Sequence, residues 1–342
     1  MVNKLMKSQK PDGRTEKQIP IRNLSGIDQF HGLHKIPADG EWVDIPESLA
    51  KRLAGDSNYD IADPKLNHRR FNRRAASTAG KRVDIIIPVH NQLDYLKRCI
   101  SSIKQHTTDY SLIIIDDASD KETADWIKKQ KFDCIIRHEK PRGFGRSCNE
   151  GIAKSTAPWI CLLNSDTLVT PHWLSTMRSV ASLGFDIVGP TTSHSSGAQC
   201  DHSITPDRIK MTTRQVNEVA DRKLREHMTD YLECDVFGFC IMFSSEVVKF
   251  IGGLDHKRYL DGYYEDWDFV WRAQRFGFRS AWAKGSYVHH YGGTSFYGRI
   301  GEKAVQELSE RNRLVFEKRV QEETDLYFDI KESMKYDTSS PC

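Results

Sequence analysis

The feature that most constrains the fold is a series of short apolar runs that alternate with amphipathic stretches. In the stretch 91–106, Leu93, Leu96, Ile100 and Ile103 recur at helical spacing, which predicts a helix with one buried face. Strand, helix and strand repeated with short connections predict a mostly parallel sheet that helices cover on both faces. The runs predicted as buried strands are "VDIIIP" (83–88), "SLIIID" (111–116), "FDCIIR" (132–137) and "PWICLLN" (158–164).

Polar residues follow three of these strands directly. Ligands of an open parallel sheet bind beyond the carboxyl ends of its strands. His90 and Asn91 follow the first strand, Asp117 the second, and Ser165 and Asp166 the last. Two carboxylates that face one crevice repel each other unless a cation or a hydrogen-bonding ligand lies between them. A nucleotide with a divalent metal ion satisfies both.

The second half of the predicted domain is less regular. A helix is expected over 172–184 and strands over 185–190 and 235–244. Between the last two lies a polar region, 191–230, which is interpreted as a long loop and a candidate substrate lid. Further elements are expected as a short helix over 245–253, a helix over 263–277 that opens on acidic residues, strands or loops over 279–283 and 285–293, and a charged helical tail over 301–334.

Composition excludes several classes of protein. A hydrophobic share of 38% and a charged share of 28% over 342 residues are typical of a globular chain and exclude collagen-like or wholly disordered proteins. No apolar run approaches the roughly 20 residues of a membrane-spanning helix, and the N-terminus lacks the apolar core of a signal peptide. We therefore expect a cytoplasmic protein. The eight cysteines form no Cys-x-x-Cys pair, which favours buried free thiols.

The basic charge is concentrated near the N-terminus. The stretch Lys65 to Arg82 holds seven basic residues and no acidic one. It is interpreted either as a solvated linker or as a docking strip for an anionic partner such as a membrane surface, a nucleic acid or an acidic glycan. Residues 1–64 are predicted to form a small accessory segment.

A set of motifs carries a resemblance to a known family. The motifs resemble those of family 2 glycosyltransferases, which are inverting enzymes of the GT-A fold, and within that family the bacterial rhamnosyl-type and surface-polysaccharide transferases. The resemblance implies a Rossmann-like, mostly parallel sheet flanked by helices over 82–298, after an accessory segment (1–64) and a basic linker (65–81) and before a helical tail (299–342). The motifs, in chain order, are "IIIPVHNQLDYLKRCISSI", "IIIDDASD", "RGFGRSCNEGI", "WICLLNSDTLVTPHWL", "FGFCIMFSSEVVKFIGGLD", "YYEDWDFVWRAQRFGFR" and "VHHYGGTSF".

The resemblance implies a nucleoside-diphosphate-sugar donor, UDP- or dTDP-linked. Asp117 would accept a hydrogen bond from the base, although its position also suits a turn or helix-capping acid. Arg142 would face the diphosphate, with an ordinary surface arginine as the alternative. The donor-binding residues implied are Pro88, Val89, Asp117, Arg142, Asn149 and Ser165.

The resemblance also implies a metal site. "NSD" occupies the place of the family's Asp-x-Asp motif, so Asp166 matches the last acid, while Asn164 and Ser165 replace the earlier carboxylates. One carboxylate can suffice for a hard cation because phosphates and water fill its shell. His290 is the second implied ligand, with His289 as the alternate. An imidazole ligand suits Mn²⁺, and Mg²⁺ stays open.

Asp266 in "YYEDWDFVWR" matches the family's catalytic base, which takes a proton from the acceptor hydroxyl. Its place at a helix start is expected to keep it ionised. Glu265 is the alternative base or an acceptor ligand. Trp267 and Trp271 are candidates for stacking on a sugar, and helix spacing favours a core position for Trp271.

The acceptor is expected to be a polysaccharide or a lipid-linked glycan, the latter at the inner membrane face. Two alternatives stay open: transfer of sugar to modified bases in DNA, for which no nucleic-acid-reading motif is present, and a non-catalytic nucleotide- or sugar-binding module. A dinucleotide-dependent dehydrogenase is disfavoured because no Gly-x-Gly-x-x-Gly turn follows the first strand.

Overall fold

The structure is a computed structural model. It describes residues 82–195, 198–204, 209–259, 262–292 and 301–336, together with the backbone of five short strands nearer the N-terminus. The chain divides into two compact units, one of residues 1–79 with 275–277 and one of the remaining residues. The basic linker predicted over 65–81 lies outside the described residues.

The first unit contains two small antiparallel sheets. β1 (Gln18–Asn23) pairs with β4 (Trp42–Pro46) and β5 (Tyr59–Ile61), and β2 (Gln29–His31) pairs with β3 (His34–Ile36).

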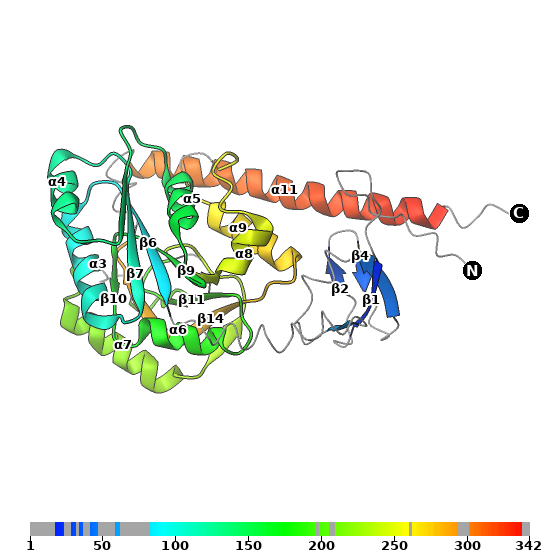
Figure 1. The fold of residues 1–342 in the computed structure, drawn as a ribbon, viewed down its shortest axis with the longest axis horizontal. Coiled ribbons are helices and arrows are strands. Elements are labelled where there is room, and N and C mark those ends of the chain that lie inside the picture. The colour runs from blue at the N-terminus through cyan, green and yellow to red at the C-terminus, as the bar shows by residue number, and fades with distance from the viewer. Residues whose placement is uncertain are drawn as a thin grey trace, which may run out of the picture. The chain divides into compact units, whose positions relative to one another are not determined.

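The second unit is built on a nine-stranded sheet (Figure 1). Its order is β10-β14-β11-β13-β9-β6-β7-β8, with β12 paired to β14. The part β9-β6-β7-β8 is parallel, as is the pair β11-β14, and the other pairings are antiparallel. The strands are β6 (Val83–Val89), β7 (Tyr110–Asp116), β8 (Cys134–Arg137), β9 (Trp159–Leu163), β10 (Thr167–Val169), β11 (Ile187–Thr191), β12 (Tyr231–Glu233), β13 (Cys240–Ser244) and β14 (Ser280–His290).

Both faces of the sheet are covered by helices. Alternate residues of β6 share one core with the buried faces of α3 (Leu93–His106) and α6 (Trp173–Ala181). On the opposite face, Ile86 packs against Gly151 of α5 (Phe144–Lys154), where a Cβ on the glycine would lie 2.3 Å from the Ile86 methyl group. The prediction of an α/β fold with a central sheet flanked by helices is confirmed.

The remaining helices are α4 (Lys121–Lys129), α7 (Thr213–His227), α8 (Ser245–Ile251), α9 (Glu265–Arg275) and α11 (Glu302–Tyr336). Helix α7 lies within the region interpreted as a long loop, so that interpretation was wrong for residues 213–227. The helix begins with a capping box, in which the side chains of Thr212 and Gln215 satisfy each other's backbone N–H groups. The two segments left as strands or loops, 279–283 and 285–293, instead form the single strand β14 over most of their length.

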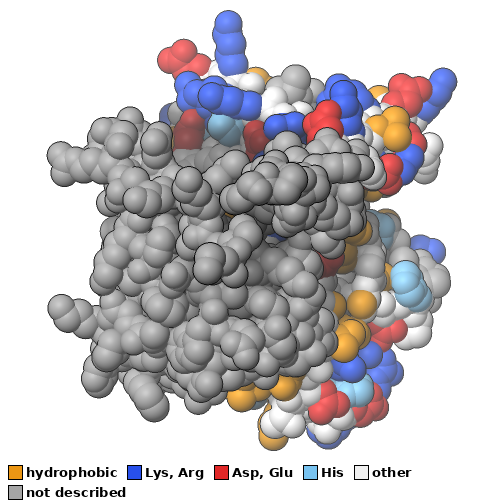
Figure 2. Space-filling model, turned by 90° about the vertical axis from the view of Figure 1, so that its right-hand side faces the viewer, with side chains coloured by type: hydrophobic (Ala, Val, Ile, Leu, Met, Phe, Trp, Pro, Cys, Tyr) orange, Lys and Arg blue, Asp and Glu red, His pale blue; other side chains and the backbone are white. Residues whose placement is uncertain are grey.

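The described surface is mixed in charge. Basic and acidic side chains are interspersed on the part of the face that Figure 2 shows in colour. Helix α11 contributes i,i+4 pairs such as Lys318–Glu322. The seven cysteines within the described residues are free, and four of them are buried. Among the helices described, none is long and apolar enough to cross a membrane.

Candidate functional site

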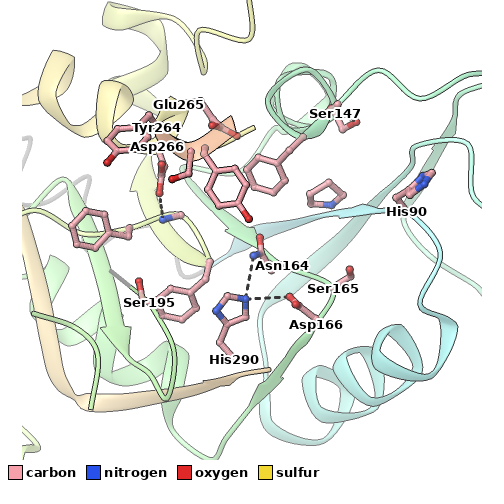
Figure 3. Close-up of a pocket in the computed structure, with 18 of the residues that line it drawn as sticks. His90, Ser147, Asn164, Ser165, Asp166, Ser195, Tyr264, Glu265, Asp266 and His290 are labelled. Atoms are coloured by element: carbon pink, nitrogen blue, oxygen red, sulfur yellow. Dashed lines mark hydrogen bonds and ion pairs between the residues drawn. The ribbon is translucent and has the colours of Figure 1, made fainter. Parts of the chain in front are cut away.

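A cavity of about 380 Å³ opens where the parallel strands end. The ends of β6, β7 and β9 line it, and so do the start of α5, the segment 237–239 and the residues that enter α9. Asp166 and Asp266 both line this one cavity. In Figure 3, Asn164, Asp166 and His290 gather in one part of it, and Glu265 and Asp266 lie in another.

The loop Asn164–Asp166 links β9 to β10 and is held by neighbouring strands. The backbone N–H of Asn164 donates to the carbonyl of Phe239 (2.9 Å), just before β13. His290 at the end of β14 is paired in register with Thr167 of β10. The loop after β9 and the end of β14, which are far apart in the sequence, therefore bring an amide, a carboxylate and an imidazole to one place.

The hydrogen bonds of His290 define which nitrogen faces Asp166. Its Nδ1 lies 2.7 Å from the carbonyl of His194, which can only accept, so Nδ1 carries the proton. In the neutral ring, Nε2 then holds a lone pair, and it lies 3.2 Å from Oδ1 of Asp166 and 3.4 Å from Nδ2 of Asn164. A lone pair that faces a carboxylate oxygen is unfavourable unless a cation lies between them or the imidazole is protonated.

A second observation fits a cation at the same place. Oδ1 of Asn164 is buried and lacks a hydrogen-bond partner within the described part of the chain. An amide oxygen, a carboxylate and an imidazole together suit Mn²⁺ or Mg²⁺ with phosphate oxygens or water in the remaining positions. Within the described residues, no group of three or more His, Cys, Asp or Glu side chains could hold a metal ion by itself, so an ion here would depend on ligands from a substrate.

The alternate histidine lies elsewhere. His289 is buried, its Nδ1 lies 3.0 Å from the hydroxyl of Tyr287, and its ring packs edge-on against Tyr291 at 4.8 Å. His289 does not line the cavity, whereas His290 does.

Pro88, Val89 and Asp117 line the side of the cavity where β6 and β7 end. The Asp117 carboxylate accepts the backbone N–H groups of Arg142 (2.7 Å) and Gly143 (3.0 Å), and its Oδ1 lies 2.6 Å from Nδ1 of the buried His138. Asp117 therefore also orders the loop that starts α5.

Two of the residues predicted to bind the donor do not line the cavity. The Arg142 side chain is partly exposed and pairs with Glu150 (2.9 Å). The Asn149 amide donates to the carbonyl of Leu254 and accepts its N–H, both at 2.8 Å, so it ties α5 to the loop after α8. Ser165, by contrast, is buried in the cavity wall.

Glu265 and Asp266 are the first two residues of α9. Glu265 is 2% exposed, and its Oε2 is buried with no hydrogen-bond partner among the described residues. Burial, and then the adjacent Asp266 charge, raise the pKa of Glu265 to about 8. At neutral pH the Glu265 carboxyl is therefore mostly protonated and can donate a hydrogen bond.

The pKa of Asp266 differs from the expectation that its place at a helix start keeps the carboxylate ionised. Burial raises its pKa, and hydrogen bonds from backbone N–H groups, the largest from Gly238, only partly oppose this. The Gly238 N–H donates to Oδ2 (2.8 Å), and a Cβ on Gly238 would lie 2.8 Å from the Asp266 Cβ, so this close approach requires glycine. Loss of hydration outweighs the helix terminus here.

The turn into α9 is strained. Gly262, Tyr263 and Tyr264 have φ angles of 102°, 67° and 71°. Each tyrosine in this left-handed region costs roughly 1–2 kcal/mol. Both tyrosines line the cavity as a result.

Aromatic rings form the wall beside Asp266. Trp267 packs on Phe237 at 4.4 Å and stacks on Tyr264 at 5.6 Å, and all three line the cavity. Trp271, one helical turn further, packs edge-on against Phe316 of α11 and does not line the cavity. Trp271 is thus half-buried between α9 and α11, away from the cavity, and not in the fully buried core favoured for it.

Several cavity residues were not singled out from the sequence. They are His194 and Ser195, from the region interpreted as a candidate lid, Ser309 of α11, and Phe144, Phe237 and Phe239. The motifs "RGFG" and "FGFC" contained these phenylalanines and could have indicated them, whereas no local pattern marks His194 or Ser309.

Comparison with known proteins gives sequence relatives. Residues 84–252 match the model of the family described as Glycosyl transferase family 2. The chain is 25% identical over 160 residues to an undecaprenyl-phosphate 4-deoxy-4-formamido-L-arabinose transferase of Serratia proteamaculans, a match covering 44% of this chain and 47% of that protein. It is 38% identical over 96 residues to the poly(ribitol-phosphate) beta-N-acetylglucosaminyltransferase TarP of Staphylococcus aureus, covering 26% of this chain and 29% of TarP. The chain thus spans about half or less of the length of these relatives.

Solved structures give weaker likenesses. The structure of S. aureus TarS 1-349 aligns with a TM-score of 0.44 and 14% identity over 64% of this chain and 62% of that one. A structure of GalNAc-T7 with UDP, GalNAc and Mn2+ aligns with a TM-score of 0.47 and 17% identity over 61% of this chain and 43% of that one.

Proposed function

Because this chain belongs to glycosyltransferase family 2 through residues 84–252, we propose that it is a metal-dependent, inverting glycosyltransferase. It moves a sugar from a nucleoside-diphosphate sugar to a hydroxyl group of a polysaccharide or lipid-linked glycan. The observation that carries the proposal is the single cavity that holds both the Asp166–His290 group and the Glu265–Asp266 pair.

The donor would lie along the ends of β6, β7 and β9. Pro88, Val89 and Asp117 line the part of the cavity proposed for the nucleoside. Asp166, His290 and the Asn164 amide oxygen would hold the divalent ion. When bound, the ion supplies positive charge that stabilises the departing diphosphate.

Asp266 is proposed as the base. Its Oδ2 is occupied by the Gly238 N–H, which orients the carboxylate, and its Oδ1 would accept the proton of the acceptor hydroxyl as that oxygen attacks the anomeric carbon. A raised pKa makes Asp266 a stronger base than an exposed aspartate, provided that it is ionised. Glu265, protonated at neutral pH, would donate a hydrogen bond to a substrate oxygen rather than compete as the base.

The acceptor would lie against the aromatic wall of Phe237, Tyr264 and Trp267, because sugar rings stack on aromatic faces through their C–H groups. The name of TarP contains poly(ribitol-phosphate), and that of the Serratia transferase contains undecaprenyl phosphate. These names support a polymeric or a lipid-linked acceptor, and the latter would bring the protein to a membrane face.

The test is release of nucleoside diphosphate from a panel of sugar nucleotides, with Mn²⁺, Mg²⁺ or EDTA, in the presence of candidate acceptors. We expect turnover with one donor, loss of turnover with EDTA, and loss with Asp266→Asn while nucleotide binding persists. Product analysis by NMR should show an inverted anomeric configuration.

The alternatives predict other results. Binding of a nucleotide sugar without turnover across all donors and acceptors would indicate a non-catalytic module. Transfer to DNA containing hydroxylated bases, with no transfer to glycans, would indicate a DNA-modifying enzyme. Retention of anomeric configuration would refute the role of Asp266 as a base that acts in a single displacement.

A further inference from the structure

Helix α11 contacts the residues around the proposed base through one stripe of its surface. Val305 and Leu308 of this stripe are buried, Ser309 lines the cavity, and Asn312 is 0% exposed. Phe316 continues the stripe two turns after Ser309 and lies about 6 Å, between ring centroids, from Tyr264, Trp267 and Trp271. Figure 1 shows α11 running past α9 and α8.

Asn312 makes the most specific of these contacts. Its Nδ2 donates to the carbonyl of Gly262 (2.7 Å) and to that of Tyr263 (3.2 Å), and its Oδ1 accepts from the Arg311 side chain (3.2 Å). A single buried amide thus satisfies two carbonyls of the strained left-handed turn. A turn with two tyrosines at positive φ persists only where surrounding contacts hold it.

The turn determines where the acidic pair lies. The Tyr264 carbonyl accepts the N–H of Asp268 (3.0 Å) and so starts the hydrogen bonding of α9. Glu265 and Asp266 follow directly and line the cavity. If the turn relaxed toward ordinary backbone angles, the first turn of α9 would shift, and both carboxyl groups would shift with it.

Arg319, two helical turns after Asn312 on α11, contacts the first turn of α9. Its guanidinium forms an ion pair with the buried Asp268 and lies 3.4 Å from Asp255, while its carbon centre lies 5.5 Å from the Trp271 ring centroid. Arg272 pairs with the other oxygen of Asp268 at 2.6 Å. An arginine thus pairs with each carboxylate oxygen of Asp268, which balances its charge and fixes its position.

We propose that Asn312 is a positioning residue for the Glu265–Asp266 pair, and that α11 completes the acceptor side of the site by clamping the left-handed turn. The part that concerns catalysis rests on the proposed function. Asn312 touches no reacting atom in this scheme and acts through the turn.

The test compares Asn312→Leu, which keeps the branched shape but removes both donors, with Arg313→Gln. Arg313 is the next residue, forms ion pairs with Glu310 and Glu317 of its own helix, and lies at the surface. Hydrogen exchange by mass spectrometry should show faster exchange over 262–268 in Asn312→Leu, with unchanged exchange over α3, and no change in Arg313→Gln. If Asn312→Leu does not fold, Asn312→Ser, which keeps one donor, is measured in the same way.

Turnover supplies the second readout. With the donor found active in the panel, Asn312→Leu should lower kcat by about 10- to 100-fold, because small displacements of a reacting group have effects of this size. The donor KM should stay within about 2-fold, since the donor side of the cavity is untouched. If Asn312 had a merely structural role, Asn312→Leu would lower the melting temperature without lowering kcat selectively over the donor KM.

The outcomes separate the two proposals. Unchanged exchange over 262–268 in Asn312→Leu overturns the clamp, whatever the activity. Faster exchange there with wild-type kcat overturns the positioning role. If Asn312→Leu exchanges faster than wild type over 262–268 but the wild-type protein releases nucleoside diphosphate from no donor, the clamp stands and the proposed function fails.

Discussion

Replacing Glu265 by glutamine should make the protein more stable at neutral and alkaline pH. Glu265 is 2% exposed, has an unpartnered Oε2 among the described residues and adjoins Asp266. Glutamine has nearly the same shape and cannot ionise, so Glu265→Gln removes the cost of keeping the buried carboxyl protonated at a pH where the unfolded chain ionises it, without opening a cavity.

The sign and size follow from the shift in pKa. The pKa of Glu265 is raised from 4.5 to about 8, so the folded state holds a proton that the unfolded chain releases above pH 4.5. The contribution of Glu265 to stability is therefore greatest at acid pH and falls as the pH rises from about 4.5 to about 8. At about 1.4 kcal/mol per pH unit, the cost is on the order of 3 kcal/mol at pH 7.

The assay is urea unfolding of wild type and Glu265→Gln at several pH values between about 5 and 8. We expect the stability difference in favour of the variant to grow by about 3 kcal/mol over this range. Difference infrared spectra at pH 7 should also show the carbonyl stretch of a protonated carboxylic acid in wild type only. The matched control is Glu246→Gln on α8, a half-exposed glutamate paired with Lys249, which should leave the pH dependence unchanged.

A difference that stays below about 1 kcal/mol and does not vary with pH would refute this reasoning. It would mean that Glu265 is ionised at neutral pH, so that a cation or water compensates its charge. Glu265 could then serve as a base, and the division of roles with Asp266 would have to be reversed or shared.

Three further predictions concern other groups. Burial would raise the pKa of Asp84, but hydrogen bonds, led by those from the backbone of Ala157 and Thr156, lower it. Asp84→Asn should therefore cost about 2–3 kcal/mol of stability near neutral pH. Because the ionised form of Asp84 is favoured, this loss of stability should shrink as the pH falls below about 4, and a constant loss down to acid pH would contradict the prediction. Asp166→Ala should abolish Mn²⁺-dependent thermal stabilisation by a nucleoside diphosphate, measured by thermal shift, and stabilisation that survives EDTA would count against a metal role. Trp267→Ala should raise the acceptor KM about 10-fold with little change in melting temperature, whereas Trp271→Ala should mainly lower the melting temperature; similar effects of both on the acceptor KM would argue against the aromatic wall.

Patterns that are local in sequence predicted much of the fold. Apolar runs and helical spacing indicated β6, β7, β9 and α3, and the motifs indicated the family, which the match over 84–252 confirms. Helix α7 was missed because its flanking Ser, Thr, Gly and His residues dominated the composition of 191–230. The Thr212–Gln215 capping box was a readable start signal for it.

Contacts between distant segments could not be predicted in this way. Asn312 lies within the charged run "ERNRL", which reads as a solvent-facing helix, and its role depends on carbonyls 49 and 50 positions away. His194 fixes the tautomer of His290 through its backbone carbonyl, so its side-chain type gives no signal for this contact. The pKa of Asp266 was expected from its helix position alone, while burial, which decides the direction of the shift, depends on the whole cavity.

The departure from the family's Asp-x-Asp pattern has an electrostatic consequence. With Asn164 and Ser165 in place of acids, the ion site holds one carboxylate, Asp166, beside an imidazole that is neutral when Nδ1 alone carries a proton. One negative charge attracts a divalent ion more weakly than two or three do, so we expect the ion to bind tightly only together with a diphosphate, whose charges complete its shell. Metal and donor binding should therefore be coupled, and each should raise the affinity of the other by the same factor.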